Sequence, residues 1–264
     1  MKKDGKIVFF DIDGTIFEQG KGTPDSTREA LCLLKENGHI PVVCTGRSKA
    51  SVFPEILELE FPAMIAGAGT YVEYEENVIR NLLLNHELVE RTVPRLEGAG
   101  CALVLEGPEY LSYRRNGGAA DYYNVLSRLH REYPHQIKEM EPGKDEANKI
   151  SARISDTEAF EALAPELEKD FSIVRYERFP FVEMMPAGIN KAAGIEALIT
   201  HLGIPRSHTY AFGDGPNDLE MLQYVQYGTA MGNSEDSVFK TAKYKTEGIW
   251  EDGIYLGLKR YGLI

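Results

Sequence analysis

The sequence has little cysteine and no long apolar run. Three cysteines among 264 residues are too few and too scattered for a disulfide framework, and they fit a reducing compartment. We expect Cys32, Cys44 and Cys101 to be small core residues. No apolar run approaches the roughly 18 residues that a membrane span needs. The run at residues 7–10 is also too short for a signal peptide. These absences predict a cytoplasmic protein that does not enter a membrane.

An excess of positive charge and a histidine or thiolate metal pattern are also missing. The chain carries 29 basic and 41 acidic residues, a net charge of −12, which argues against non-specific nucleic-acid binding. Its six histidines show no metal-ligand spacing, and neither H-x-x-x-H nor C-x-x-C occurs. An anionic substrate would therefore need positive charge supplied locally by its binding site.

The composition is that of an ordinary globular protein, with 43% hydrophobic and 27% charged residues. The chain length allows one large domain or two modest ones. The pattern predicts a Rossmann-like α/β fold with a doubly wound parallel sheet, because strand, helix and strand follow one another with connections long enough for parallel crossovers. The predicted strands cover residues 6–11, 39–45, 63–66, 70–75 and 209–213, and the predicted helices 24–37, 191–202 and 218–224.

The middle of the chain has a different texture. Amphipathic helices alternate there with short strand-like pieces, which indicates a separate α+β unit inserted into the first domain. We therefore predict a catalytic core at residues 1–81 and 186–264, and a cap at residues 82–185 that closes over the site as a lid. Arg114, Lys149 and Glu183 are polar residues on or near its strands, and solvent exposure explains each as well as substrate contact does.

Two aspartates end the first predicted strand. Asp11 and Asp13 are two residues apart and project to the same side, and Gly14 allows a sharp turn after them. In open parallel sheets, ligands bind beyond the carboxyl ends of the strands. Two close carboxylates repel each other unless a cation lies between them or one keeps its proton. A polar turn after a core strand is the plain alternative, and it is favoured for an isolated D-x-D pair.

Further polar residues follow the later strands and one helix start. Thr45 and Gly46 end the second strand, where phosphate oxygens can accept hydrogen bonds. Lys191 follows a predicted N-cap, near the positive end of a helix, although such a lysine is usually solvated. Asp214 directly ends a buried strand, whereas Asp218 has the simpler interpretation of a helix cap. Hard oxygen ligands without histidine or thiolate suit Mg²⁺ beside a phosphate, so the residues together predict a phosphoryl-transfer site.

These segments resemble, in order, the four motifs of the haloacid dehalogenase-like phosphohydrolases. The large insertion between the second and third motifs is similar to that of the Cof-type branch, which includes sugar-phosphate phosphatases. Residues 230–233 and 251–254 also resemble that branch, but Ala68-Gly69 stands where the branch often has Asn-Gly. The four matching motifs are Asp11-x-Asp13-Gly14-Thr15, Thr45-Gly46-Arg47, Lys191, and Gly213-Asp214-Gly215-x-Asn217-Asp218.

The resemblance implies a role for each motif residue. Asp11 is the expected nucleophile that forms an aspartyl-phosphate, and Asp13 the expected general acid and base. Mg²⁺ is expected to bind the Asp11 carboxylate, the Asp13 backbone carbonyl and Asp214. The expected phosphate-binding residues are Thr45, Gly46, Lys191 and Asn217, with Asp218 and Arg47 in supporting positions.

The leading hypothesis is a Mg²⁺-dependent phosphatase of small phosphorylated metabolites, chiefly sugar phosphates. A phosphomutase with the same aspartyl-phosphate chemistry remains an alternative. A receiver-like signalling module lacks an acid at the position of Asp13 and has no such insertion, and a dehalogenase needs no carboxylate cluster for a metal. A catalytically idle phosphate-binding protein is disfavoured because every motif residue is present. The expected partner is a small phosphorylated metabolite, with a monomer or a homodimer both plausible.

Overall fold

A computed structural model describes residues 5–114, 120–132, 135–141, 143–176 and 180–264. The chain divides into two compact units. Unit 1 contains the residues up to Gly46, Val52–Arg80 and Asn190–Ile264, and unit 2 contains Arg47–Ser51 and Asn81–Ile189. The predicted α/β class with a parallel-sheet core is confirmed by the strand pairing of unit 1.

Unit 1 is built on a sheet whose described strands run in the order β14-β13-β12-β1-β2-β3-β4-β5. The central strand, β1 (Ile7–Phe10), pairs in parallel with β2 (Ile40–Cys44) and with β12 (Thr209–Gly213). Parallel pairing continues outward on both sides, to β14 and to β3, and the β3–β4 pair is antiparallel. The remaining strands are β3 (Ala63–Ala66), β4 (Tyr71–Tyr74), β5 (Asn77–Asn81), β13 (Tyr227–Ala230) and β14 (Tyr244–Lys245).

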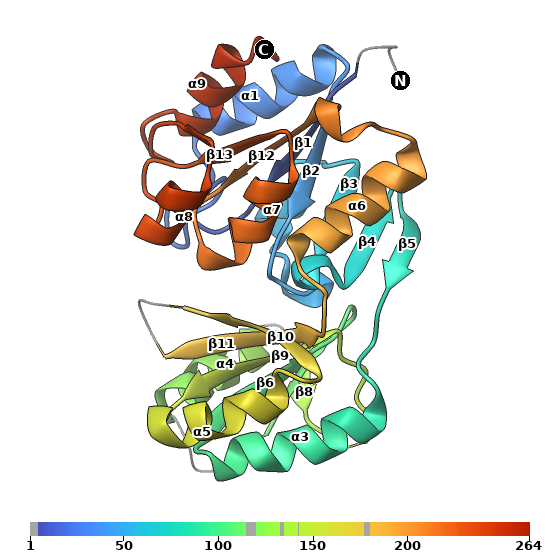
Figure 1. Cartoon of the computed structure of the whole chain (residues 1–264), viewed down its shortest axis with the longest axis vertical. Coiled ribbons are helices and arrows are strands. Elements are labelled where there is room, and N and C mark those ends of the chain that lie inside the picture. Colours follow the sequence, from blue (N-terminus) through green and yellow to red (C-terminus); the bar gives the residue numbers. More distant parts are fainter. Residues whose placement is uncertain (1–4, 115–119, 133–134, 142, 177–179) are drawn as a thin grey trace. The chain divides into compact units, whose positions relative to one another are not determined.

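Helices cover both faces of this sheet, as in a doubly wound fold (Figure 1). One face packs against α1 (Asp25–Glu36) and α9 (Gly253–Arg260), which also contact each other. The other face packs against α6 (Lys191–Leu202), α7 (Leu219–Tyr224) and α8 (Asp236–Thr241). A one-turn helix, α2 (Pro54–Leu57), and short 3-10 turns complete the described part of unit 1.

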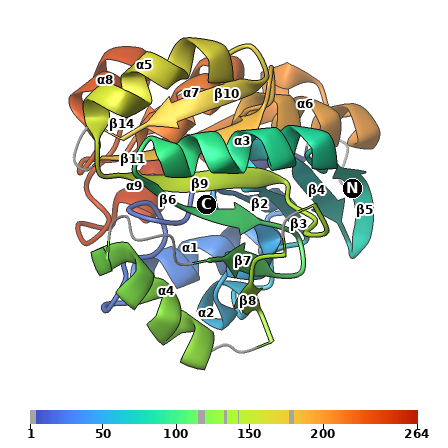
Figure 2. The same cartoon turned by 90° about the horizontal axis from the view of Figure 1, so that it is seen from below.

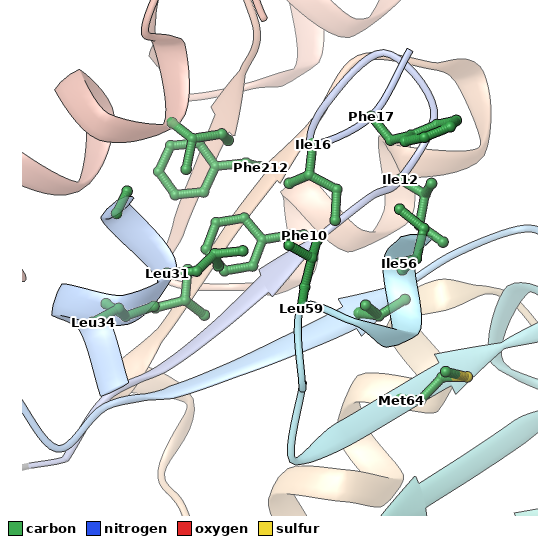
Figure 3. Close-up of a cluster of buried hydrophobic side chains, with 14 of the residues drawn as sticks. Phe10, Ile12, Ile16, Phe17, Leu31, Leu34, Ile56, Leu59, Met64 and Phe212 are labelled. Carbon is green, nitrogen blue, oxygen red and sulfur yellow. The ribbon is translucent and has the colours of Figure 1, made fainter. Parts of the chain in front are cut away.

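The core beneath the α1 face is buried and combines aromatic with aliphatic side chains. Phe10 of β1 stacks on Phe212 of β12 with 5.5 Å between ring centroids, and Leu31 and Leu34 of α1 belong to the same cluster (Figure 3). Burial of a side chain of this size contributes about 1.5–3 kcal/mol. Because every residue of β1 is buried, its C-terminal end is held rigidly, and the residue that follows it is Asp11.

Unit 2 is a separate α+β layer structure. Its described strands run in the order β10-β11-β9-β6-β7-β8, and all adjacent pairs are antiparallel except β7–β8. The helices α3 (His86–Gly98) and α5 (Thr157–Leu167) cover one face, and α4 (Ala120–Glu132) lies over the other (Figure 2). The strands are β6 (Cys101–Glu106), β7 (Leu111–Tyr113), β8 (Ile137–Glu139), β9 (Lys149–Ile154), β10 (Phe171–Arg175) and β11 (Phe181–Pro186).

Two differences from the sequence predictions concern the division of the chain and one cysteine. The segment Arg47–Ser51 groups with unit 2, because Ala50 packs into the apolar cluster that contains Ala102 and Val104. The prediction of a core position was wrong for Cys32, which is exposed, whereas Cys44 and Cys101 are buried. Cys32 follows Leu31 by one residue, about 100° around α1, and so points away from the buried stripe. No helix in the described ranges combines the length and the apolarity that a bilayer span requires.

Candidate active site

Asp11 and Asp214 follow neighbouring strands of the unit 1 sheet. Because β1 and β12 are parallel and adjacent, their carboxyl ends lie at the same edge. The backbone N–H of Asp11 donates to the carbonyl of Phe212, 3.1 Å away, which extends the pairing by one residue. The Asp11 side chain is buried and that of Asp214 is partly buried. The sheet edge thus brings together two acidic residues that are about 200 positions apart in the sequence.

Lys191 reaches the same place from the start of α6. The Asn190 side chain caps this helix by accepting a hydrogen bond of 3.0 Å from the Ala193 N–H, as predicted. The Lys191 ammonium lies 2.6 Å from Oδ1 of Asp11 and 2.5 Å from Oδ1 of Asp218, and its side chain has no exposure to solvent. The alternative of a solvated lysine is therefore wrong. A fully buried lysine is rare unless it is paired, and this one has two carboxylate partners.

Three carboxylates form one cluster at this edge. One oxygen each from Asp11, Asp214 and Asp218 lies within 4.8 Å of the other two. Asp13, the expected fourth acidic member, is exposed, although its charge acts on both Asp11 and Asp214. Three carboxylates beside one ammonium leave an excess of negative charge in a buried place. Such a set could hold a divalent cation.

The protonation equilibria reflect this excess. Burial raises the pKa of Asp11 well above its ordinary value, and the neighbouring carboxylates raise it further, against the lowering effect of Lys191. Burial and the charge of Asp218 raise the pKa of Asp214 to about 7. For Lys191, burial alone lowers the pKa, but the attraction of Asp11 and Asp218 outweighs it, and the pKa is raised. Perturbation by both desolvation and specific charges is typical of functional sites.

The turn after Asp13 packs directly on Asp214. Gly14 has φ +82°, and a Cβ atom at this position would lie 2.2 Å from Oδ2 of Asp214, so only glycine is accommodated. The buried hydroxyl of Thr15 donates to Oδ1 of Asp214 at 2.9 Å. The sequence reasoning assigned no role to Thr15. Its place in the first motif, directly after Gly14, was the signal that could have indicated one.

Asp218 does not cap α7. Its Oδ2 accepts hydrogen bonds from the backbone N–H groups of Asp214, at 2.9 Å, and Gly215, at 3.0 Å, while its Oδ1 binds Lys191. No side-chain bond to the first turn of α7 is present at this described N-terminus. Asp218 therefore fixes both the loop after β12 and the Lys191 ammonium. Asn217 is partly buried in the same loop, and its expected contact with phosphate stays a prediction.

The second motif follows β2. Thr45 is buried, donates from its N–H to Ile65 at 2.8 Å, and accepts at its carbonyl from the N–H of Ala68 at 2.9 Å. Ala68 occupies the position where the branch often has asparagine. Its φ of 52° lies in the left-handed region that asparagine and glycine adopt more readily than alanine. The backbone at this position therefore retains a conformation suited to the residue that this sequence lacks.

The predicted roles of Gly46 and Arg47 stay predictions. Gly46 is buried in unit 1, next to Thr45. Arg47 groups with unit 2, where its guanidinium donates to the Ser51 carbonyl at 3.1 Å. That bond closes a local turn, and it gives Arg47 a structural partner beside its expected supporting position.

Unit 2 has a polar cluster of its own. Lys149 is 1% exposed, pairs with Glu183, and lies 3.4 Å from Oε1 of Glu106. Tyr176 donates to Oε2 of Glu183 at 2.8 Å, and Ser151 donates to Glu106. Solvent exposure therefore does not explain Lys149 and Glu183. In contrast, the partly exposed Arg114 forms a two-bond pair with Glu97, at 2.7 and 2.8 Å, which accounts for its presence.

Comparison with known proteins agrees with this geometry. Residues 8–258 match the family model of haloacid dehalogenase-like hydrolases. The chain belongs to this family. It is 32% identical to YkrA of Bacillus subtilis (strain 168) over 264 residues, covering 99% of each chain. It is also 28% identical to 5-amino-6-(5-phospho-D-ribitylamino)uracil phosphatase YitU of the same organism, covering 97% of each.

The solved structures give the same result. The chain superposes on a subclass IIB sugar phosphatase of this superfamily with a TM-score of 0.84, at 28% identity, covering 98% of this chain and 100% of the other. The resemblance drawn from the four motifs is confirmed. The chain is a phosphatase of the haloacid dehalogenase-like family, as predicted.

Proposed function

We propose that this phosphatase hydrolyses phosphate monoesters of small metabolites, chiefly sugar phosphates, with Mg²⁺ and through an aspartyl-phosphate at Asp11. The observation that carries the proposal is the buried triad in which the Lys191 ammonium bridges Asp11 and Asp218. A nucleophilic carboxylate needs nearby positive charge before it can approach a phosphate dianion. Lys191 supplies part of that charge at a distance of 2.6 Å from the reacting side chain.

The donor set suits a hard divalent cation. The cluster offers only carboxylate oxygens, which Mg²⁺ prefers, and their repulsion in a buried place would be relieved by a cation. Asp11 and Asp214 would hold the ion together with the backbone carbonyl of Asp13, with Asp218 adjacent. Bound Mg²⁺ would neutralise charge on the phosphoryl oxygens and polarise them.

Asp11 and Asp13 divide the covalent chemistry. A carboxylate oxygen of Asp11 forms a bond to phosphorus while the bond from phosphorus to the leaving oxygen breaks, and Asp13 gives that oxygen its proton. Asp13 then accepts a proton from water as the water oxygen bonds to phosphorus and the bond to Asp11 breaks. Phosphate leaves, and both side chains return to their starting states.

Lys191 supports both steps through its hydrogen bonds. An ammonium has three N–H donors. Among the described residues, two of these donors bind Asp11 and Asp218. The third can bind a phosphoryl oxygen. A donor held in place before the reaction stabilises developing charge without reorganisation.

Two relatives support sugar phosphates as the substrate class. One solved neighbour is a sugar phosphatase, and YitU acts on a phosphorylated ribityl compound. A phosphomutase would use the same residues but would return the phosphoryl group to an organic acceptor. Release of inorganic phosphate in a one-to-one ratio with substrate loss would distinguish hydrolysis from that alternative.

The decisive experiment replaces the nucleophile. Asp11→Asn should lower turnover of p-nitrophenyl phosphate by roughly 10³-fold or more, because a carboxamide is a poor nucleophile. Asp25→Asn makes the same chemical change at an exposed position of α1 and should leave turnover unchanged. Omitting Mg²⁺ and adding EDTA should abolish activity of the unmodified protein. Undiminished turnover by Asp11→Asn would refute the proposal.

A further inference from the structure

Residues 230–233, one of the two C-terminal segments in the family resemblance, pack against residues 247–249, which directly precede the second segment. The N–H of Gly232 donates to the carbonyl of Glu247 at 3.0 Å. A Cβ atom on Gly232 would lie 2.5 Å from the backbone nitrogen of Gly248. Glycine at position 232 therefore permits a backbone approach that other residues would block. The proposed mechanism assigns no role to either segment.

Asn233 connects this pair of segments to the catalytic turn. Its side-chain Nδ2 donates to the carbonyl of Gly14 at 2.8 Å, and its Oδ1 accepts from the N–H of Ile249 at 3.0 Å. Both ends of the amide are thus used, one on each side. A second hydrogen bond joins the same two parts of the chain, from the indole N–H of Trp250 to the side chain of Glu18.

The bond at Gly14 fixes the residue that follows the expected general acid. Gly14 donates from its N–H to the Phe17 carbonyl at 2.9 Å, so the peptide group between Asp13 and Gly14 is anchored. Asn233 anchors the next peptide group, on the other side of the Gly14 Cα. Gly14 has a φ in the left-handed region, and glycine can adopt many other backbone conformations. The two hydrogen bonds therefore hold the backbone at Gly14 in one conformation.

We propose that Asn233 is a positioning residue that aims the Asp13 carboxyl at the leaving oxygen by holding the turn after it. The inference rests on the proposed function, since it concerns how Asp13 delivers its proton. Displacement of a general acid by about 1 Å can cost a large part of its effect. The loss depends on the leaving group, because a nitrophenolate departs readily without a proton whereas an alkoxide does not.

The test compares two substrates in Asn233→Ala and in the unmodified protein, each with saturating Mg²⁺. We expect kcat/KM for glucose 6-phosphate to fall roughly ten-fold or more beyond the fall for p-nitrophenyl phosphate, mainly in kcat. Asn37→Ala is the matched control. It removes a 2.8 Å bond from an asparagine side chain to a backbone carbonyl, that of Leu263, elsewhere in unit 1. In this variant, kcat/KM for glucose 6-phosphate should change by the same factor as kcat/KM for p-nitrophenyl phosphate.

A second variant separates positioning from folding. Asn233→Asp keeps the acceptor for the Ile249 N–H but loses the donor to Gly14, and it should show the same selective loss. Equal losses for both substrates, or an unfolded circular dichroism spectrum for both Asn233 variants, would overturn the inference. Failure of the unmodified protein to hydrolyse either substrate would instead contradict the proposed function.

Discussion

The Lys191 ammonium lies 2.5 Å from Oδ1 of Asp218, and neither side chain is exposed to solvent. Asp218 also accepts two backbone N–H bonds from the loop that carries Asp214. The pair therefore joins the start of α6 to the loop after β12. Its two ends come from different motifs, so one buried ion pair holds distant parts of the candidate site together.

Replacing Lys191 should cost both stability and activity. Lys191→Met leaves Asp11 and Asp218 buried without their cation, and breaking a buried pair costs about 3–5 kcal/mol. Chemical denaturation at neutral pH measures this change. Lys243→Met, at an exposed position of unit 1, should stay within about 0.5 kcal/mol of the unmodified protein. Equal stabilities for the two variants would contradict the prediction.

The stability of the metal-free protein should decrease as the pH rises towards neutrality. The pKa of Asp214 is raised from 3.8 to about 7, so between these values the folded protein keeps a proton that the unfolded chain has released. The free energy of unfolding then falls with rising pH, by at most about 1.4 kcal/mol per pH unit from this group. Urea denaturation in EDTA between pH about 4 and about 8 measures the slope.

The Asp214→Asn variant isolates this contribution. An asparagine oxygen can still accept the Thr15 hydrogen bond, but the side chain no longer titrates. Relative to the unmodified protein, the variant should therefore gain stability as the pH rises through the same window. Parallel stability curves for the two proteins would show that Asp214 does not titrate as stated. Added Mg²⁺ should stabilise the unmodified protein near neutral pH but not the variant.

Removing the Thr15 hydroxyl should weaken Mg²⁺ binding. The 2.9 Å bond from Thr15 to Oδ1 favours the ionised form of Asp214 and lowers its pKa. Thr15→Val keeps the shape but loses the bond, so the apparent Mg²⁺ affinity should fall several-fold, by isothermal titration, at pH about 7. Thr15→Ser keeps a hydroxyl and should retain most of the affinity. Identical Mg²⁺ affinities for the valine and serine variants would contradict a role of the Thr15 hydroxyl in Mg²⁺ binding.

The buried charges of the polar cluster in unit 2 should stabilise the fold of that unit. Burial alone lowers the pKa of Lys149, but the charges of Glu106 and Glu183 outweigh this effect, and the pKa is raised. Lys149→Met should destabilise unit 2 by about 3 kcal/mol or more, since two buried carboxylates lose their cation. The double variant with Glu183→Gln should recover part of the loss. No recovery would mean that the charges do not interact as described.

The sequence predicted much of the fold and of the site. β3, β12 and α6 have the predicted bounds, because apolar runs and clear start signals mark them. β13 was missed, since it has four residues and includes a glycine, which usually indicates a loop. At Gly228 a Cβ atom would lie 2.0 Å from the Leu222 carbonyl, so packing and not a turn requires that glycine.

Contacts between distant residues account for what could not be predicted in the site. Asp11 and Lys191 were expected to meet, because each stands at the end of a predicted element. The bonds from Thr15 to Asp214 and from Asn233 to Gly14 depend on how loops from different ends of the chain pack. The burial of Lys149 likewise depends on which sheet face α4 covers, which hydrophobic periodicity alone does not specify.

The chain contains one tryptophan, Trp250, and its indole N–H is bonded to Glu18, five residues beyond Asp13. This residue is 44% exposed, so its emission is sensitive to the polarity around it. The protein thus carries a natural fluorescent reporter, free of spectral overlap from other indoles, that is bonded to the segment following its first motif. Rearrangements of that segment can be followed in real time without attaching any label.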